Sequence, residues 1–222
     1  LQFRVPVFSC MLAHDGAKHP KKIQGCCLVE YKYDGVRVIG IVKNGKATLY
    51  SRNGKIFHNF PHIENALSKT EYNNMVFDGE VMSDDFQALM KQVYRKSGAN
   101  TDDAYLALFD MLPLKEFNSG KSLLNTIERK EELNKMSQTF NEEIKLVDYE
   151  IINFDEKAGQ VKFSTMNKEA LDKGFEGLMI KPTKNFYECK RSHAWLKIKP
   201  FIEVTLKVID IQEGTGKHAG KL

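Results

Sequence analysis

The stretch Glu30-Tyr31-Lys32-Tyr33-Asp34-Gly35-Val36-Arg37 is the part of this chain around which the rest is best interpreted. It places a lysine, a carboxylate, a glycine and an arginine within six residues, between two runs typical of β-strands. A single lysine in a strand is usually a solvated edge residue. We nevertheless expect Lys32 to be a covalent nucleophile, because polar residues suited to that role recur along the sequence.

Composition narrows the class of protein. The chain has 222 residues, 42% hydrophobic and 10% aromatic, which is enough for a substantial core. No apolar run approaches the ~20 residues that span a bilayer, and the N-terminus lacks the pattern of a signal peptide. We therefore expect a protein that is not secreted, has no membrane partner and works in the cytosol or nucleus.

The cysteines and the charges are also informative. The four cysteines show no C-x-x-C spacing, so they suggest neither a zinc site nor a disulfide framework, and we expect reduced thiols. The net charge is only +4, but the basic excess is concentrated in residues 181–199, where six cations accompany one acid, Glu188. Phe186, Tyr187 and Trp195 lie in the same stretch, a mixture suited to phosphates.

Hydrophobic periodicity predicts an α+β domain built on largely antiparallel sheets with flanking helices. The Asn44-Gly45 pair between two strand-like runs predicts a tight hairpin, because both residues tolerate the positive φ of a type I′ turn. Residues 1–25 read as loop with one short strand. The expected strands are 26–32, 36–42, 47–50, 75–82, 105–112, 175–181, 194–199 and 204–211, and the expected helices are 61–68, 85–96, 122–136 and 155–173.

Several polar residues stand where packing alone would not put them. Asp78 and Glu80 share one face of an apolar strand by its period of two, and two such carboxylates are costly to bury without a cation. Glu176 enters another apolar strand. Lys197 and Lys199 share the face of Trp195, and two ammonium groups with no acid between them favour an anion. We expect these residues to meet at one phosphate-binding site.

A nucleotide site would account for this set. A lysine must be neutral to attack, yet ~0.1% or less of an ordinary lysine is deprotonated at pH 7, since its pKa is near ~10.4. Cations such as Lys197 and Lys199 would lower that pKa and hold the phosphate under attack. Glu80 and Glu176 could place Mg²⁺, which prefers oxygen ligands and bridges carboxylates to phosphates. These residues predict an enzyme that joins a lysine to a nucleotide, without specifying the acceptor.

Six motifs then show a resemblance to a known family. In order and rough spacing they resemble motifs I, Ia, III, IIIa, IV and V of the ATP-dependent DNA ligases, particularly the compact phage and viral enzymes. The motifs are Lys32-Tyr33-Asp34-Gly35-Val36-Arg37, Ser51-Arg52-Asn53-Gly54, Phe77-Asp78-Gly79-Glu80, Leu108-Phe109-Asp110, Glu176-Gly177-Leu178-Met179-Ile180-Lys181 and Trp195-Leu196-Lys197-Ile198-Lys199. Together they cover residues 30–200.

The resemblance implies a fold and a domain division. Residues 1–200 would form an ATP-grasp-like nucleotidyltransferase (adenylation) domain, and residues 201–222 the truncated beginning of an OB fold. The implied activity is DNA ligation, as used in repair, replication and recombination. AMP would pass from ATP to Lys32, then to the 5′-phosphate of nicked double-stranded DNA, before a 3′-hydroxyl displaces it.

The resemblance also implies a role for each matching residue. Lys32 would form the lysyl-AMP, and the nucleotide would be held by other residues of the motifs and their neighbours: the backbone at Glu30 and Tyr31 on the adenine edge, Phe109 stacked on adenine, Arg37 and Glu80 on the ribose, and Lys197 and Lys199 on the α-phosphate. Arg52 would contact the 5′-phosphate of the nick, while Asp34, Glu80 and Glu176 would serve Mg²⁺. A core position for Phe109 stays open, because strand parity groups it with Tyr105, Ala107 and Met111.

Three alternatives also stay open: an mRNA-capping guanylyltransferase that uses GTP, an RNA ligase, and a non-enzymatic nucleic-acid-binding module. The pairing of Ser51-Arg52-Asn53-Gly54 with Phe77-Asp78-Gly79-Glu80 favours a DNA ligase over the capping enzyme. Because the sequence ends about 20 residues into the expected OB fold, we expect weak or no self-adenylation from ATP and impaired nick sealing from these 222 residues alone.

Overall fold

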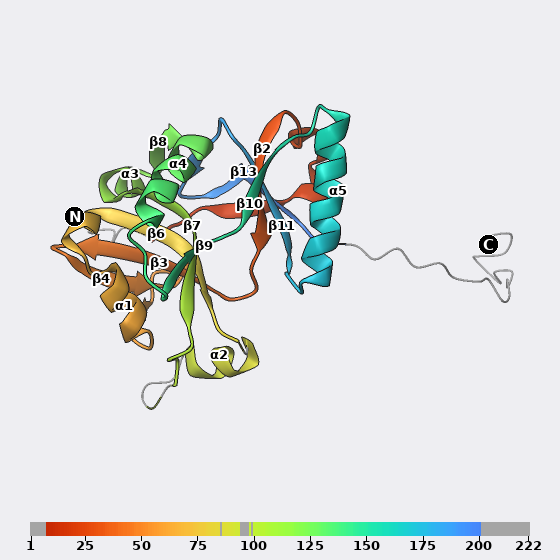
Figure 1. Ribbon diagram of the computed structural model, residues 1–222. Helices are drawn as coiled ribbons and strands as arrows, with labels where there is room; N and C mark the ends of the chain where they lie inside the picture. The colour runs from red at the N-terminus through yellow and green to blue at the C-terminus, as the bar shows by residue number, and fades with distance from the viewer. Residues whose placement is uncertain (1–7, 85, 94–97, 99, 201–222) are drawn as a thin grey trace, which may run out of the picture.

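The computed structural model describes residues 8–84, 86–93, 98 and 100–200, and its described strands form two main sheets and a small ribbon (Figure 1). The six-stranded sheet has the order β5 (Ile56–Phe57), β4 (Lys46–Tyr50), β3 (Val36–Lys43), β6 (Met75–Met82), β7 (Tyr105–Pro113) and β9 (Ile144–Leu146). The five-stranded sheet has the order β1 (Leu12–Asp15), β13 (Arg191–Ile198), β11 (Gly177–Pro182), β2 (Cys26–Lys32) and β10 (Tyr149–Asn153). The ribbon pairs β8 (Lys121–Asn125) with β12 (Phe186–Glu188).

Helices flank these sheets. The α-helices are α1 (Pro61–Leu67), α2 (Phe86–Val93), α3 (Leu114–Ser119), α4 (Thr126–Ser137) and α5 (Lys157–Asp172), and three short 3₁₀ helices are η1 (Gly16–Lys18), η2 (Pro20–Lys22) and η3 (Thr70–Tyr72). Figure 1 shows α5 along the five-stranded sheet and α1 beside the six-stranded sheet, while α2 lies at the ends of β6 and β7. None of the described helices is long and apolar enough to cross a membrane.

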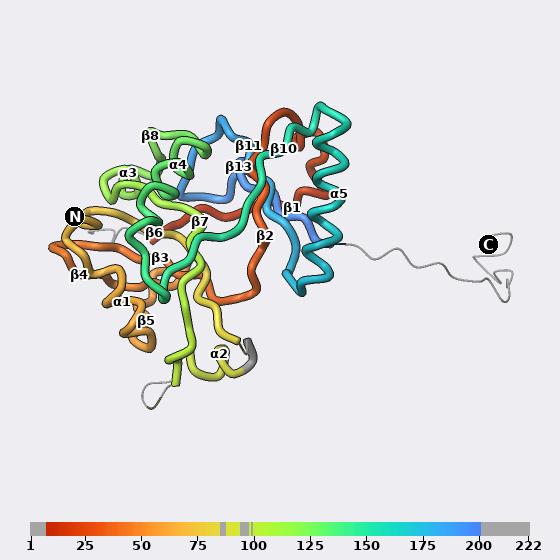
Figure 2. The backbone as a smooth tube through the Cα atoms, viewed as in Figure 1, coloured from red at the N-terminus to blue at the C-terminus, as the bar shows by residue number. Residues whose placement is uncertain are grey.

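The core forms three apolar layers, one of which lies between the two sheets. One lies between the six-stranded sheet and α1, and includes Val38 and Ile63. Another joins Ile39 of β3 to Trp195 of β13, so it lies between the two sheets. The third packs α5 on the five-stranded sheet, with Met166 against its strands. Figure 2 traces the chain through this arrangement, in which β2, β10 and β11 lie together beside α5. The site described below lies where the two sheets face each other.

The predicted α+β class with largely antiparallel sheets is confirmed. Among the described strands, only β1–β13 and β7–β9 pair in parallel. The predicted hairpin is present, with positive φ at Asn44 (52°) and Gly45 (70°) and Lys43 paired with Lys46. The predicted strand 204–211 and the predicted domain 201–222 lie outside the described residues.

One predicted helix was wrong at its start. Residues 122–125 belong to strand β8, and helix α4 begins at Thr126. Asn125 caps the helix: its side chain accepts from the Glu128 N–H, and the Glu128 carboxylate accepts from the Asn125 N–H. This Asn-x-x-Glu capping box is a start signal that the apolar periodicity of the segment concealed.

Short elements account for most of the other differences. Helix α3 and strands β9, β10 and β12 were not predicted from the sequence, and they are six, three, five and three residues long. Segments this short carry few periods of any hydrophobic pattern. Their pairing partners, which are distant in sequence, determine their conformation.

Candidate active site

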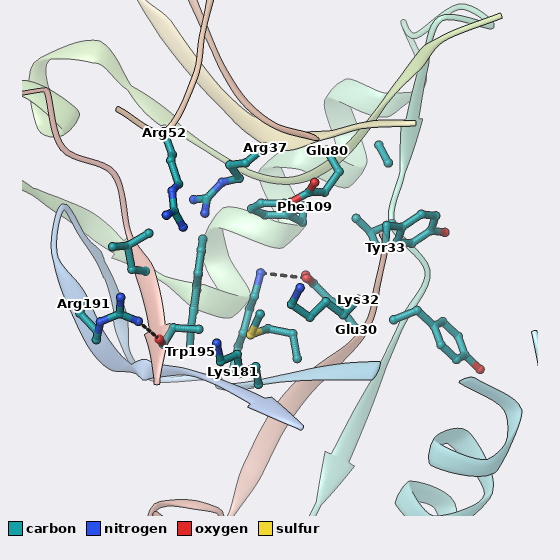
Figure 3. A pocket seen from close by; sticks show the side chains of 17 residues that line it. Glu30, Lys32, Tyr33, Arg37, Arg52, Glu80, Phe109, Lys181, Arg191 and Trp195 are labelled. Carbon is teal, nitrogen blue, oxygen red and sulfur yellow. Dashed lines mark hydrogen bonds and ion pairs between the residues drawn. The ribbon is translucent and has the colours of Figure 1, made fainter. Parts of the chain in front are cut away.

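A cavity between the two sheets collects most of the residues that the sequence singled out (Figure 3). Eight of the predicted site residues line it: Glu30, Tyr31, Lys32, Arg37, Arg52, Glu80, Phe109 and Lys197. Glu176 lines an adjoining cavity together with Lys32 and Glu80. Asp34 and Lys199 are exposed and line neither of these two cavities.

Lys32 occupies the mouth of the cavity because strand β2 ends at this residue. The chain then turns tightly towards β3. A Cβ at Gly35 would lie 2.4 Å from the Val81 carbonyl oxygen and 2.6 Å from the Met82 sulfur, so only glycine allows the turn to approach β6 this closely. The spacing of Lys32 and Gly35 in the motif thus has a local structural cause.

The immediate partner of Lys32 is an acid, Glu176, and not the cations expected from the sequence. The Lys32 ammonium donates to the Glu176 carboxylate, and the two side chains are 26% and 43% exposed. The Glu176 N–H also donates to the Lys32 carbonyl, which aligns the two residues across neighbouring strands. An ammonium held by a carboxylate is not a nucleophile, so a nucleophilic role for Lys32 would require this pair to separate.

The two lysines of the last motif have different positions. Lys197 lies on β13 opposite Met179 of β11 and lines the cavity, although it is exposed. Lys199 follows the last residue of β13 and does not line the cavity. The structure therefore brings one of the two expected phosphate-binding cations to the site in this conformation.

Phe109 reaches the cavity because of a β-bulge. In the β6–β7 pairing Asp78 lies opposite Asp110 and Gly79 opposite Leu108, which leaves Phe109 without a partner. Bulged residues are often redirected at functional sites. The Phe109 ring packs edge-on against Trp195, with ring centroids 5.6 Å apart, and both residues line the cavity. Strand parity cannot predict the direction of a bulged side chain, which is why the sequence left this position open.

The floor of the cavity contains charged groups that were not predicted from the sequence. Lys181 is 2% exposed and pairs with Glu30 at 2.8 Å. Lys130 of α4 approaches the other oxygen of Glu30 at 2.7 Å and donates to the Phe109 carbonyl. The Lys181 ammonium also lies 4.7 Å and 4.3 Å from the ring centroids of Phe109 and Trp195, within the range of cation–π attraction.

Burial lowers the pKa of Lys181, although the Glu30 carboxylate opposes the shift. The sequence signal for this lysine was its place at the end of the apolar run 177–181, where a charge needs a buried partner. For Lys130 no local signal exists, because its helix brings it to Glu30 from 100 residues away.

Of the two carboxylates on β6, Asp78 has a structural role. It is fully buried, and the Arg37 guanidinium donates to both of its oxygens while the Tyr187 hydroxyl donates to one of them at 2.7 Å. Arg37 also donates to the Met11 carbonyl, so it joins β3, β6 and the segment before β1. This arrangement holds Arg37 at the wall of the cavity. It also gives the buried Asp78 the cationic partner that the sequence predicted.

Glu80 is the carboxylate of β6 that lines the cavity. Burial raises the pKa of Glu80 to about 7, against the opposing attraction of Arg37 and Lys32. Ionisation of a buried carboxylate becomes more favourable when a cation lies beside it. The position of Glu80 therefore suits contact with a metal ion or another positive charge.

The three acids predicted to serve Mg²⁺ are not gathered into a ligand cluster. Among the described residues, one group of histidine, cysteine or acidic side chains is close enough together to hold a metal ion. It consists of three histidines outside this cavity. Glu80 and Glu176 nevertheless line the same cavity. Mg²⁺ is commonly held by one or two carboxylates together with substrate phosphates and water, so these two residues fit such a site.

Arg52 lies in the turn after β4 and lines both cavities. Its backbone is fixed by the turn, in which the Gly54 N–H donates to the Ser51 carbonyl and the Ser51 N–H to the Lys55 carbonyl. Its side chain is exposed at the mouth, where it can meet a ligand that approaches from outside.

Comparisons with known proteins agree on one family. The family model described as "ATP dependent DNA ligase domain" matches residues 10–199. The DNA ligase of Methanothrix thermoacetophila is 30% identical in an alignment 215 residues long, which covers 90% of this chain and 37% of the relative. A solved structure titled "Pmar-Lig_Pre." is 45% identical, with a TM-score of 0.84, and the match covers 98% of this chain and 52% of the other.

A more distant structure shares the fold. The ATP-dependent DNA ligase from bacteriophage T7 in complex with ATP has a TM-score of 0.69 at 20% identity, covering 87% of this chain and 69% of that one. This chain spans about a third of the length of the curated relatives that it matches, and about half of the length of the solved structures that are 45% identical to it.

Proposed function

This chain belongs to the ATP-dependent DNA ligase family, and from this premise we propose that it is a nucleotidyltransferase core that accepts AMP on Lys32 and passes it to nicked double-stranded DNA. The observation that carries the proposal is the position of Lys32 at the mouth of a cavity that has an aromatic floor and buried cations. The Phe109 and Trp195 rings suit a base, and Lys197 and Arg52 suit phosphates.

The reaction would use these residues in three steps. First, the Lys32 amine attacks the α-phosphorus of ATP, which forms a P–N bond and releases pyrophosphate, with Lys197 beside the α-phosphate. Next, a DNA 5′-phosphate oxygen displaces Lys32, and AMP passes to the DNA. Finally, a 3′-hydroxyl attacks the 5′-phosphate, which forms the phosphodiester and releases AMP. Such transfers depend chiefly on positioning and charge neutralisation.

The residues of the site would divide this work. The floor, with Glu30, Lys181 and Phe109, would hold the base, and Arg37 would contact the ribose. Glu80 and Glu176 would hold Mg²⁺, which would supply charge neutralisation at the phosphates. Glu176 would then have to release Lys32, so the ion pair seen in the structure would belong to the state before attack.

The remaining expectations for Asp34 and Lys199 stay predictions. Asp34 would support the metal and Lys199 would contact the α-phosphate only after the chain around them moves towards the cavity, since both side chains are exposed. DNA as substrate would place the protein in the cytoplasm of a prokaryotic or phage-infected cell or in a nucleus, where it would act as a monomer.

Covalent labelling tests the proposal. The protein is incubated with Mg²⁺ and α-labelled ATP or GTP, and label that survives denaturation is counted. Because the relatives are longer, the assay is run on this chain and on the same chain extended by the C-terminal segment of a relative. We expect weak or no label on this chain alone, and label from ATP on the extended chain that is lost in Lys32→Arg and is transferred to nicked DNA.

The alternatives give different outcomes. Label from GTP alone would indicate a capping-type guanylyltransferase, and sealing restricted to nicked RNA would indicate an RNA ligase. Absence of label in both forms, with DNA binding retained, would indicate a binding module. Each of these three results would contradict the proposal.

A further inference from the structure

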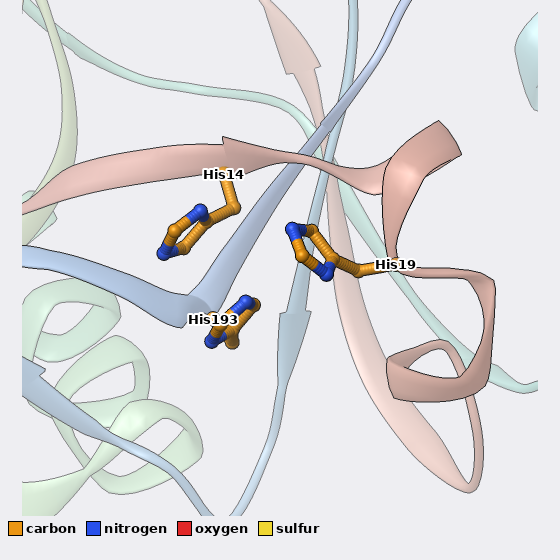
Figure 4. Close-up of side chains that lie close together, drawn as sticks. All are labelled: His14, His19 and His193. Atoms are coloured by element: carbon orange, nitrogen blue, oxygen red, sulfur yellow. The ribbon is translucent and has the colours of Figure 1, made fainter.

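Three histidines form a cluster outside the active-site cavity (Figure 4). His14 lies near the end of β1, His19 lies between η1 and η2, and His193 lies in β13. One ring nitrogen from each lies within 4.8 Å of the others. None of the three lines the cavity that contains Lys32.

Two features of the backbone bring them together. In the parallel pairing of β1 with β13, Ala13 lies opposite Ser192 but His14 lies opposite Leu196, so three extra residues, 193–195, bulge from β13. His193 belongs to this bulge and thereby faces His14. The bulge also contains Trp195, so the histidine cluster and the active-site floor share one irregular segment.

His19 follows η1, and the close packing of η1 on β13 places it beside the other two histidines. A Cβ at Gly16 would lie 2.4 Å from Cδ1 of Ile198 and 3.2 Å from the Lys197 carbonyl oxygen, so η1 packs closely on the end of β13. The His19 N–H donates to the Gly16 carbonyl, and the His19 carbonyl accepts from the Lys22 N–H at 2.9 Å. The imidazole of His19 makes no capping hydrogen bond to η2.

The contacts within the cluster leave one polar atom without a partner. The His14 and His193 rings are stacked, with centroids 3.9 Å apart and planes 7° apart, and His19 meets both edge-on. Nε2 of His193 is buried and has no hydrogen-bond partner among the described residues. A buried, unpaired imidazole nitrogen is unfavourable unless something binds it.

The surroundings favour neutral rings, the form that binds metals. Slight burial lowers the pKa of both His14 and His193; further lowering comes from His19 and Arg191 at His14, and from the other two histidines and Lys22 at His193. Neutral imidazole offers a lone pair, whereas imidazolium does not.

We propose that His14, His19 and His193 bind one divalent transition-metal ion, with Zn²⁺ as the expected occupant. Imidazole nitrogen suits Zn²⁺, Ni²⁺ and Cu²⁺, whereas Mg²⁺ prefers oxygen. Three histidines with a water molecule would complete a tetrahedral Zn²⁺ site.

Binding requires a small rearrangement. A metal lies in the plane of each imidazole that ligates it, so the stacked rings of His14 and His193 must rotate until their nitrogens converge. Zn–N bonds of ~2.0–2.1 Å place tetrahedral ligand nitrogens ~3.3–3.4 Å apart, which is within the 4.8 Å limit that the three ring nitrogens already meet. The bulge of β13 and the position of η1 already bring the three side chains together, so the change asked of the site is a rotation of the imidazole rings. The bound ion would fasten the η1–η2 segment to β13.

Titration with Co²⁺, a coloured substitute for Zn²⁺, tests the site. Protein without a purification tag is titrated while the visible absorption is recorded, and Zn²⁺ is then added in competition. We expect a saturable spectrum at one Co²⁺ per chain, displaced by one Zn²⁺, without a thiolate charge-transfer band. His19→Ala, whose position lies outside the strands, should weaken binding at least ~100-fold, since even second-sphere partners of ligating histidines affect affinity ~10–100-fold.

Two matched controls make the outcome decisive. His58→Ala removes an exposed histidine outside the cluster and should leave binding unchanged, and Cys26→Ser removes an exposed thiol. Loss of the spectrum in His19→Ala and His14→Gln, but in neither control, supports the site. Absence of saturable binding, equal binding by His19→Ala, or dependence on Cys26 would overturn the proposal and leave the three rings as an aromatic stack.

Discussion

Lys181 and Glu30 form a buried ion pair in the floor of the active-site cavity, with 2.8 Å between the ammonium nitrogen and a carboxylate oxygen. Each residue is 2% exposed. Lys130 pairs with the second oxygen of Glu30, so one carboxylate compensates two buried lysines. Glu30 is therefore the shared acidic partner of both buried ammonium groups in this floor.

Glu30→Gln should destabilise the protein strongly. The change leaves Lys130 and Lys181 buried without their acid, and breaking a buried pair in this way costs ~3–5 kcal/mol of unfolding free energy. Lys181→Met should lower the unfolding free energy less, because Glu30 then remains paired with Lys130. Urea unfolding measures both, with Glu150→Gln in the exposed Glu150–Lys162 pair as the control, expected to cost ~0–1 kcal/mol. If Glu30→Gln lowers the unfolding free energy no more than this control does, Glu30 does not stabilise the two buried lysines.

Phe109→Leu should weaken nucleotide binding more than it weakens folding. Stacking of a base on an aromatic side chain is worth ~1–3 kcal/mol, so we expect the KM for ATP in the labelling reaction to rise about 10-fold. Phe186→Leu, which removes a half-buried aromatic ring on β12, is the control. If Phe109→Leu lowers the unfolding free energy but leaves the KM unchanged, the ring is a core residue only.

Glu80→Gln should stabilise the fold in a pH-dependent way. The pKa of Glu80 is raised from 4.5 to about 7 in the folded protein, so the folded state holds a proton that the unfolded state loses between these values. Stability of the parent therefore falls as pH rises through this window.

The measurable quantity is the difference in unfolding free energy between Glu80→Gln and the parent. It should grow in favour of the variant from about pH 4.5 to pH 7 and then level off. Glu132→Gln on the exposed surface of α4 controls for the amide substitution. A difference that stays constant across this range would show that Glu80 is not held at a raised pKa.

Glu176→Gln distinguishes two roles for the partner of Lys32. If Glu176 places Mg²⁺, covalent labelling should slow at least ~10-fold and the Mg²⁺ concentration for half-maximal rate should rise. If the carboxylate only holds Lys32 as an ammonium, the same variant should label faster. The rate at several Mg²⁺ concentrations decides between them, with Glu188→Gln, an acid outside both cavities, as the control. We expect the slower reaction.

Much of the fold followed from local sequence. The Asn44-Gly45 hairpin and the strands that carry Lys32 and Glu80 were predictable because their turn residues and alternation act within a few positions. The resemblance of six motifs supplied the predicted site residues, and the structure brings eight of them to one cavity. The short strand β8 was predicted as helix, since its conformation depends on pairing with β12 across some 60 residues.

The sequence by itself determined the class of the fold and the candidate residues for the chemistry, because both are written in short motifs and in local periodicity. Tertiary structure alone decided how their charges are paired. It placed Glu176 on Lys32, Asp78 on Arg37, and Glu30 between two buried lysines. It also directed Phe109 into the cavity and gathered His14, His19 and His193, each through a bulge or a close packing contact. Bulges and buried ion pairs depend on register between distant strands, and register is a property of the assembled sheets.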